Sequence, residues 1–195
     1  MASTISAGTT SGTAIAIAGD TTGNLAFQTS AGTYTQTMPN VTGTVMVSGN
    51  MPAFSAYLAT TQTPTVNVIT KITLNTKEFD TASAFDSTTN YRFTPLVAGY
   101  YQINTQVSGT ASTTSPTSIW TYIYKNGAIY RSTNINTTAT ITGGTTFSVV
   151  LYLNGSTDYI ELYGQLRNST GGFFDGAGSG YGIQTAMSGS LVRSA

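Results

Sequence analysis

The chain of 195 residues contains no histidine and no cysteine, and only 7% of its residues are charged. Without these residues it cannot form a Ser-His-Asp or Cys-His catalytic relay, a thiolate zinc site or an imidazole proton shuttle. Disulfide bonds are also excluded, so burial or assembly must stabilise the fold. The 7 basic and 7 acidic residues give a formal net charge of zero, which argues against binding to nucleic acid or to an anionic membrane surface.

Long apolar runs are missing as well. No stretch approaches the roughly 18 apolar residues that a membrane-spanning helix needs, and residues 1–20 lack the cationic start and long apolar core of a signal peptide. We therefore expect a protein that does not insert into a membrane and is made in a cytoplasm.

The polar residues that are present are mostly neutral: the chain has 39 Thr, 20 Ser and 21 Gly. Thr and aromatic residues favour strands, whereas Gly and Ser favour turns. With 39% hydrophobic and 11% aromatic residues, the chain has enough apolar surface for one substantial core. The composition predicts an all-β domain with one appendage.

The appendage is an N-terminal arm, residues 1–50, in which Asp20 is the only charged residue. Its β-prone pieces are short and separated by Gly, Asp, Pro and Asn, so we do not expect it to fold alone. It is predicted to pack against other subunits or to anchor the protein to another one. The candidate anchoring residues are its larger apolar ones: Ile15, Ile17, Leu25, Phe27, Val45 and Val47.

Residues 51–195 are predicted to form the head domain, because strand-like segments recur there without a helical apolar face. In the segment that begins at Tyr101, the alternation places Tyr101, Ile103 and Val107 on the core side. Asn126-Gly127 and Asn154-Gly155 are turn signals that predict two antiparallel hairpins. The expected strands are residues 54–58, 66–74, 91–93, 99–107, 119–124, 128–132, 146–153, 159–166 and 184–192. This spacing favours a two-sheet sandwich.

Four motifs in the head resemble the globular-head domain of complement component 1q, which shares its jelly roll with tumour necrosis factor. They are Ala53-Phe54-Ser55-Ala56, the stretch Tyr91-Arg92-Phe93 to Gly99-Tyr100-Tyr101, Asp158-Tyr159-Ile160-Glu161-Leu162, and Met187-Ser188-Gly189-Ser190-Leu191-Val192. The resemblance covers about residues 53–195. It implies a jelly-roll homotrimer whose aromatic faces pack around a threefold axis and whose outer loops bind ligands. The collagen repeat that precedes this domain in animal members is not present in this sequence.

The arm is similar to N-terminal segments of structural proteins from tailed bacteriophages, through residues 9–15, 24–29 and 39–44. Together with a trimeric head, this resemblance implies a decoration protein, a head fibre or a short tail fibre.

Trp120, Tyr122 and Tyr124 alternate with Ile119, Thr121 and Ile123, so both faces of this strand are apolar. A strand of this kind suits a core on one side and a subunit interface on the other. The residues predicted for the trimer interface are Trp120, Tyr122, Tyr124, Tyr100 and Tyr101.

The Gly-rich segment 171–182 has no Lys and no strand-to-helix context, so it is not a phosphate loop. It is interpreted as an exposed loop with aromatic tips. The rings could touch a carbohydrate or pack between subunits, and Asp175 could supply one calcium ligand per subunit. The candidate outer-loop contacts are Phe173, Phe174, Asp175 and Tyr181.

Carboxylates are the remaining acid and base groups of ordinary use, and none forms a convincing catalytic pair. Asp158 and Glu161 stand three apart on a predicted strand and so point to opposite faces, with Asp158 as a turn residue. Glu78, Asp80 and Asp86 are expected in solvated loops. No enzyme activity, cofactor or metal site is predicted.

The sequence therefore favours a non-enzymatic, homotrimeric protein of a bacteriophage virion surface, anchored by its arm to the major capsid protein or another virion protein. Capsid decoration or cement, or a head fibre, is preferred because 195 residues leave no long shaft. The alternative is a short tail fibre or receptor-binding head that recognises host surface polysaccharide through residues 108–117 and 171–181.

Overall fold

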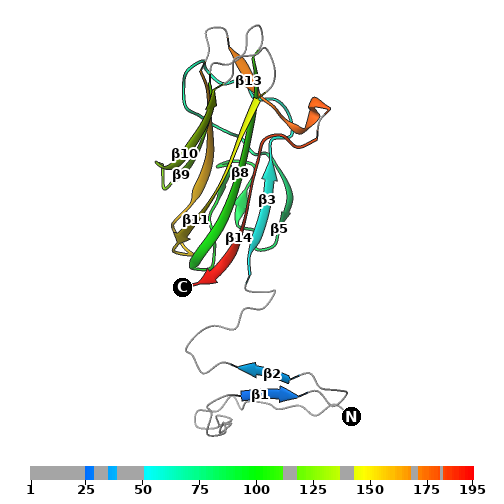
Figure 1. Ribbon diagram of the computed structural model, residues 1–195, viewed down its shortest axis with the longest axis vertical. Coiled ribbons are helices and arrows are strands. Elements are labelled where there is room, and N and C mark those ends of the chain that lie inside the picture. The colour runs from blue at the N-terminus through cyan, green and yellow to red at the C-terminus, as the bar shows by residue number, and fades with distance from the viewer. Residues whose placement is uncertain are drawn as a thin grey trace. The chain divides into compact units, whose positions relative to one another are not determined.

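Strands dominate the computed structural model, which contains two six-stranded sheets and a separate pair (Figure 1). It describes residues 51–111, 118–136, 143–167, 171–180 and 182–195, together with β1 (Leu25–Gln28) and β2 (Thr35–Met38), which pair antiparallel. The chain divides into the units Met1–Val45 and Met46–Ala195. The predicted division into an attachment arm, residues 1–50, and a head, residues 51–195, stays a prediction.

The first six-stranded sheet, here called the β8 sheet, is entirely antiparallel. Its strand order is β11-β8-β14-β3-β5, and β13 pairs with the far end of β8. The bounds are β3 (Ala53–Tyr57), β5 (Thr76–Asp80), β8 (Gly99–Ala111), β11 (Gly143–Leu153), β13 (Gly172–Phe174) and β14 (Ala186–Ser194). Because β14 lies between β3 and β8, strands distant in sequence form the centre of the sheet.

The second sheet, here called the β9 sheet, lies behind the first and is also antiparallel. Its order is β10-β9-β12-β7-β6, and β4 pairs with β12. The bounds are β4 (Thr70–Lys71), β6 (Phe85–Asp86), β7 (Arg92–Phe93), β9 (Ser118–Lys125), β10 (Ala128–Asn136) and β12 (Ile160–Arg167). The only helix among the described residues is the short 3-10 helix η2 (Ala177–Ser179), and it is too short to span a membrane.

The core lies between the two sheets and is rich in aromatic rings. Phe54 of β3 stacks on Phe93 of β7 with ring centroids 4.2 Å apart, and on Phe85 of β6 at 5.3 Å. The side chains of Thr121 and Thr145 form a hydrogen bond from one sheet to the other. The alternation in β8 is confirmed, because the inward residues Tyr101, Ile103 and Val107 are fully buried.

The first predicted hairpin is confirmed. Asn126 and Gly127 connect β9 to β10, and both have positive φ angles, 52° and 80°. Two successive positive φ angles are the geometry of the type I′ turn, which matches the twist of a two-residue hairpin. A local dipeptide signal was therefore enough to place this turn.

The second predicted hairpin is wrong. The turn at Asn154 forms, since its Oδ1 accepts backbone N–H bonds from Ser156, Thr157 and Asp158 at 2.9–3.0 Å. It connects β11 of the β8 sheet to β12 of the β9 sheet, which do not pair. Gly155 has φ +71° and an added Cβ would lie 2.3 Å from the Ala98 nitrogen, so glycine is required where the chain crosses between sheets.

The predicted strand over residues 66–74 is also wrong, except for the two-residue strand β4. Asn67 has a positive φ of 62°, which turns the chain, and its carbonyl accepts a bond from Gln165. Ile72 and Leu74 are nevertheless fully buried. Three strands, β5, β6 and β13, were not predicted. All three are short, and the partners of β5 and β13 lie far away in the sequence, whereas β6 has only two residues and pairs with the nearby β7.

Candidate functional site

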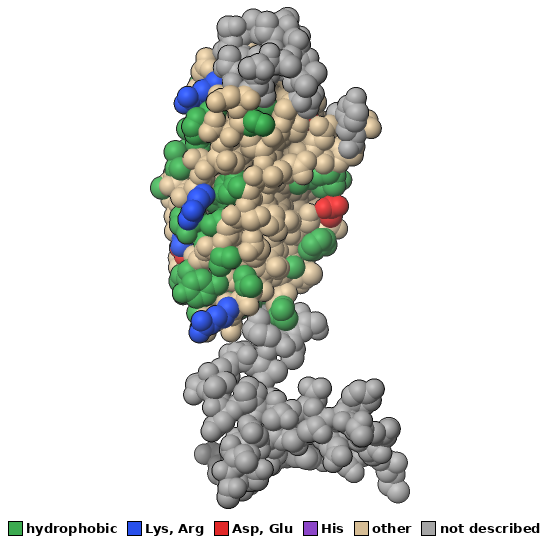
Figure 2. Space-filling view, in the orientation of Figure 1, with side chains coloured by type: hydrophobic (Ala, Val, Ile, Leu, Met, Phe, Trp, Pro, Cys, Tyr) green, Lys and Arg blue, Asp and Glu red, His purple; other side chains and the backbone are tan. Residues whose placement is uncertain are grey.

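The outward face of the β8 sheet carries rows of uncharged side chains. The register places one residue from each of β3, β14, β8 and β11 in every row. The rows are Ser55, Ser188, Asn104 and Ser148; Ala53, Ser190, Gln102 and Val150; and Tyr57, Ala186, Gln106 and Thr146. In Figure 2 the surface over β8 and β14 is mostly tan, with charged side chains towards its margins. We call these twelve residues the uncharged face.

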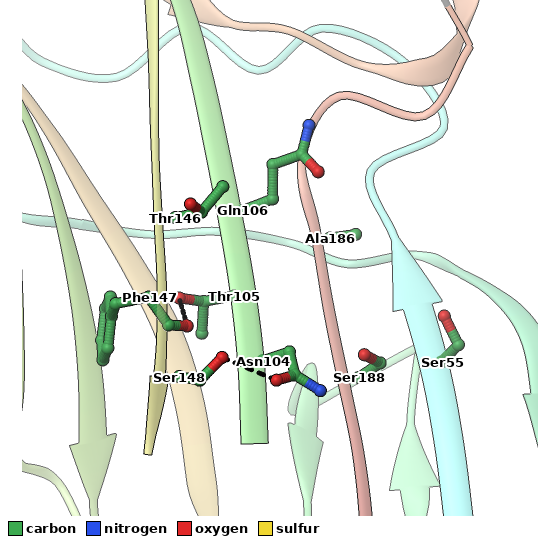
Figure 3. A pocket seen from close by; sticks show the side chains of 9 residues that line it. All are labelled: Ser55, Asn104, Thr105, Gln106, Thr146, Phe147, Ser148, Ala186 and Ser188. Carbon is green, nitrogen blue, oxygen red and sulfur yellow. Dashed lines mark hydrogen bonds between the residues drawn. The ribbon is translucent and has the colours of Figure 1, made fainter. Parts of the chain in front are cut away.

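A hollow of about 280 Å³ lies on the uncharged face (Figure 3). Ser148 Oγ donates to Asn104 Oδ1 at 2.7 Å, and Thr105 Oγ1 donates to the Phe147 carbonyl at 3.0 Å. The lining side chains are all neutral: Ser55, Asn104, Thr105, Gln106, Thr146, Phe147, Ser148, Ala186 and Ser188. One carboxylate borders the hollow, because Ser55 Oγ donates to Glu78 Oε2 at 2.6 Å.

Exposed apolar side chains gather in two further places. At one end of the β8 sheet the rings of Tyr100 and Tyr152 meet edge to face, with centroids 5.6 Å apart. The exposed residues there are Tyr100, Val150, Tyr152 and Val192, and those on the edge strand β10 are Ile129, Tyr130 and Ile135. In the described part of the chain β10 pairs only with β9, so one edge of this strand has no strand partner there.

Aromatic side chains also line the outward face of the β9 sheet. Trp120, Tyr122 and Tyr124 project from β9, and Tyr163 projects from β12 opposite Tyr122. The Trp120 and Tyr122 ring centroids are 5.9 Å apart, and those of Tyr124 and Tyr163 are 3.9 Å apart. Burial, with the nearby Glu161 carboxylate, raises the pKa of Tyr163 to about 12. We call these four aromatic residues the aromatic strip.

Hydrogen bonds fix the polar side chains beside the strip. Tyr122 donates to Gln165 Oε1 at 2.9 Å, and Arg167 Nε donates to the same oxygen at 3.2 Å. Lys71 Nζ lies 2.6 Å from Glu161 Oε1, so this nearly buried carboxylate is neutralised by an ion pair. The face is therefore preorganised and contains charge, in contrast to the uncharged face.

The structure does not bring the predicted interface residues together. Trp120, Tyr122 and Tyr124 belong to the aromatic strip on the β9 sheet, where Tyr122 is nearly buried and the other two are half-buried. Tyr100 is exposed on the opposite outward face, that of the β8 sheet. The interface assignment of these four residues stays a prediction.

The interface assignment of Tyr101 is wrong. Its side chain points inward from β8, is 0% exposed, and donates through its hydroxyl to the Val97 carbonyl at 2.7 Å. Burial raises the pKa of this phenol to about 12. A side chain fully enclosed by its own subunit has no surface left for another subunit.

The predicted outer-loop contacts are wrong for Phe174 and Asp175. Phe174 is fully buried, because β13 pairs with β8 and turns this ring into the core. Asp175 is 3% exposed and accepts hydrogen bonds from Ser108 Oγ at 2.8 Å and Thr110 Oγ1 at 3.0 Å. These bonds hold the start of the following segment against β8, which is a structural role.

The other loop and arm residues remain untested. Phe173 is half-buried in β13, and Tyr181 lies outside the described residues. Leu25 and Phe27 lie in β1. The remaining arm residues named above, Ile15, Ile17, Val45 and Val47, lie outside the described residues. The anchoring role of the arm therefore stays a prediction.

The expectation of solvated loops is wrong for Glu78 and Asp80, which lie in β5, and Asp86 ends β6. Asp86 accepts bonds from the backbone N–H groups of Thr88, Thr89 and Asn90, which hold the pKa of its carboxyl far below the usual range. Asp80 accepts from the Ala84 and Phe85 N–H groups. Within the described ranges, no three acidic side chains gather as a metal site would require.

Asp158 occupies a turn, as predicted, and its bonds make stability depend on pH. Asn126 Nδ2 donates to Asp158 Oδ1 at 2.7 Å, and Lys125 Nζ lies 3.1 Å from Oδ2. The Asn126 bond, followed by the Lys125 interactions, holds the pKa of Asp158 below its usual range. A lowered folded-state pKa contributes stability above the unfolded value of about 3.9 and loses it as the pH falls.

We expect Asp158→Asn to destabilise the protein near neutral pH and to have a smaller effect below pH about 3, where the wild-type carboxyl also becomes protonated. Urea unfolding of both proteins at the two pH values measures this difference. Equal destabilisation at both values would show that the charge of Asp158 contributes nothing to folding.

Comparison with known proteins establishes the fold alone. No protein-family model and no curated protein matches the sequence. The globular domain of zebrafish complement 1qA protein is 18% identical with TM-score 0.53, covering 74% of this chain and 98% of that one. Murine APRIL is 10% identical with TM-score 0.51, covering 73% and 99%. Eiger TNF from S. frugiperda is 8% identical with TM-score 0.53, covering 74% and 93%.

The head has the jelly-roll fold of complement 1q and tumour necrosis factor domains. The fold predicted from the four motifs is thus confirmed. Sequence reasoning missed Tyr163 as a member of the strip, Gln165 and Arg167 as its polar neighbours, and the ring contact of Tyr152 with Tyr100. The alternation within residues 159–166 and 146–153 could have placed each residue on a face, but not beside its cross-strand neighbours.

Proposed function

We propose that this protein is a non-enzymatic, homotrimeric structural protein of a bacteriophage virion surface, a capsid decoration, cement or head-fibre protein. The observation that carries the trimer is the uncharged outward face of the β8 sheet, together with the exposed apolar edge of β10. The arm, residues 1–50, would bind the major capsid protein or another virion protein. Its low-charge composition and its similarity to phage structural proteins support this part of the proposal.

Two unlike apolar surfaces favour a closed ring over a twofold dimer. A twofold interface joins the same patch on both subunits, whereas an interface between different patches closes into a ring when the rotation fits. The edge of β10, with Ile129, Tyr130 and Ile135, differs from the β8-sheet end around Tyr100 and Tyr152. Packing the edge of one subunit on the sheet of the next would cover both surfaces in all three subunits.

The side-chain chemistry supports a passive role. The chain has no His and no Cys, and Asp80, Asp86, Asp158 and Asp175 hold backbone or side-chain groups of the fold. Glu161 is neutralised by Lys71. Each of these carboxylates is therefore already engaged in a hydrogen bond or an ion pair within the subunit.

An arm that binds across neighbouring subunits would connect them. We expect deletion of residues 2–47 to abolish attachment to the virus particle while the head still assembles as a trimer. Particles that lack the protein are incubated with full-length or truncated protein, and the bound protein is measured after sedimentation. The oligomeric state of each free protein is measured in parallel by sedimentation equilibrium.

Two results would contradict the proposal. If the truncated protein still attaches to particles, the arm is not the anchor. If the full-length protein is monomeric at concentrations that saturate particles, the protein does not act as a trimer. A full-length variant carrying Asp20→Asn serves as the matched control, because it removes the only charge of the arm while keeping its length.

Host recognition, as a short tail fibre or receptor-binding head, is the second candidate function. The outer loop that was predicted to carry it loses support, since Phe174 and Asp175 are buried. The aromatic strip is the observation that now favours it, because three of its four side chains are partly exposed and it lies outside the faces proposed for trimer packing. In this second candidate function Trp120, Tyr122 and Tyr124 contact a ligand in place of the predicted subunit interface.

A further inference from the structure

We propose that the outward face of the β9 sheet binds an acidic linear polysaccharide, with sugar rings on the aromatic strip and carboxylates on Arg92 and Arg167. This inference deepens the second candidate function and names the class of its ligand. It does not depend on the proposed trimer or on the arm.

The aromatic residues form an elongated surface of ring edges. Trp120, Tyr124 and Tyr163 are half-buried. Trp120 stacks on Tyr122 and Tyr124 stacks on Tyr163, with centroids 5.9 Å and 3.9 Å apart, so these ring faces are turned towards each other and a ligand would meet their edges. Rings in such a row present apolar surface and polar tips to a ligand that has both.

Guanidinium groups stand at the two ends of this surface. Arg92, opposite Glu161 in the register, lies over the Tyr159 ring at 4.3 Å. Arg167 lies over the Trp120 ring at 5.0 Å. The Glu161 and Arg167 positions are six residues apart along β12, which corresponds to about 20 Å. A chain of several sugars could therefore contact both ends at once.

Arginine suits a carboxylate at both positions. Its planar group presents paired N–H donors that match the two oxygens of a carboxylate, and stacking on a ring fixes the plane. Two acidic groups lie nearby. Glu161 is paired with Lys71. Asp86 stands opposite Arg92, and because the bonds of its own turn hold its pKa far below the usual range, it is ionised and offsets part of the Arg92 charge. With Arg167, three cationic and two anionic side chains leave a net positive charge on this face. Charge complementarity thus favours an acidic over a neutral polysaccharide.

A second protein is a poorer occupant for this face. Aromatic residues and Arg are also common in protein interfaces, but Lys and Glu are depleted from interface centres, and Lys71 and Glu161 form an ion pair within this face. The uncharged face has the opposite character, with twelve uncharged residues in register. The outward face of the β8 sheet therefore suits packing between subunits, and that of the β9 sheet suits binding of a polar polymer.

The chain itself provides the reporter for a test, because Trp120 is its only tryptophan. The full-length protein is titrated with polygalacturonate, alginate, hyaluronan and polysialic acid while Trp120 fluorescence is recorded. We expect a saturable change with at least one of them, weakened by added salt. Fully methyl-esterified polygalacturonate tests the carboxylates without changing the sugar chain, and polyglutamate tests charge without sugar.

Two variants locate the binding surface while leaving the reporter intact. Arg92→Gln and Tyr124→Ala are each expected to weaken binding at least tenfold. Tyr152→Ala and Arg193→Gln, matched changes on the β8 sheet, are expected to leave it unchanged. Binding is also measured by ultracentrifugation, and thermal unfolding confirms that each variant is folded.

The proposal is overturned if none of the four acidic polysaccharides binds, if the neutral ester or polyglutamate binds as tightly, or if only the β8-sheet variants lose binding. Sedimentation of the same samples reports the oligomeric state. Failure of polysaccharide binding with an intact trimer, and loss of the trimer with intact binding, are therefore distinguishable.

Discussion

Replacing Phe54 with Ala is expected to lower the free energy of unfolding by about 3–5 kcal/mol, the range for removing a buried phenylalanine ring. Phe54 is 0% exposed and stacks on Phe93 and Phe85, which belong to the other sheet. Its removal leaves a cavity between the sheets and breaks two ring contacts that join them. Urea unfolding followed by circular dichroism measures the change.

Phe79→Ala is the matched control, because the same atoms are removed from a ring that is 49% exposed on β5. We expect this variant to lose less than about 1 kcal/mol, as is usual for surface substitutions. Comparable losses in the two variants would contradict the position of Phe54 at the centre of the core. The comparison also separates ring removal itself from the loss of inter-sheet packing.

Local signals in the sequence were sufficient wherever neighbouring residues determine the structure. The period of two in β8 placed Tyr101, Ile103 and Val107 in the core, because successive strand residues point to opposite sides. The Asn126-Gly127 pair predicted its hairpin, because both residues tolerate positive φ angles. The four family motifs predicted the jelly roll, although the identity to the solved structures is 18% or lower.

These local signals could not predict which strands pair when they lie far apart in the sequence. The turn at Asn154-Gly155 has the same dipeptide as the true hairpin, yet the strands it connects join different sheets. Likewise, β13 pairs with β8, more than sixty positions earlier in the chain, and this pairing buries Phe174 and Asp175. A glycine-rich segment predicts conformational freedom, whereas its contacts with a distant strand decide whether its side chains are exposed.

The scarcity of charge takes on a spatial meaning in the structure. Three ion pairs form among the described residues, Lys71–Glu161, Lys77–Asp80 and Lys125–Asp158, and each involves the β9 sheet or the sheet edges. The uncharged face contains none of these residues. Net charge is zero over the whole chain, but the charge is unequally distributed between the two outward surfaces.

This unequal distribution predicts the result of placing one charge on the uncharged face. Val150 is 50% exposed on β11, and its cross-strand neighbour on β8 is the neutral Gln102. In the proposed trimer, Val150→Glu would bury a carboxylate without a cationic partner, which costs several kcal/mol. We therefore expect the trimer to dissociate into folded monomers, as measured by sedimentation equilibrium, with little change in the circular dichroism spectrum.

Leu96→Glu is the matched control for Val150→Glu. Leu96 is another exposed aliphatic residue, 65% exposed in the loop before β8, and it is not part of the uncharged face. The same carboxylate there should leave the trimer intact, because it remains in water. If Val150→Glu also stays trimeric, the uncharged face does not form the subunit interface. If both variants dissociate, the trimer responds to added charge in general, and packing on this face is not its cause.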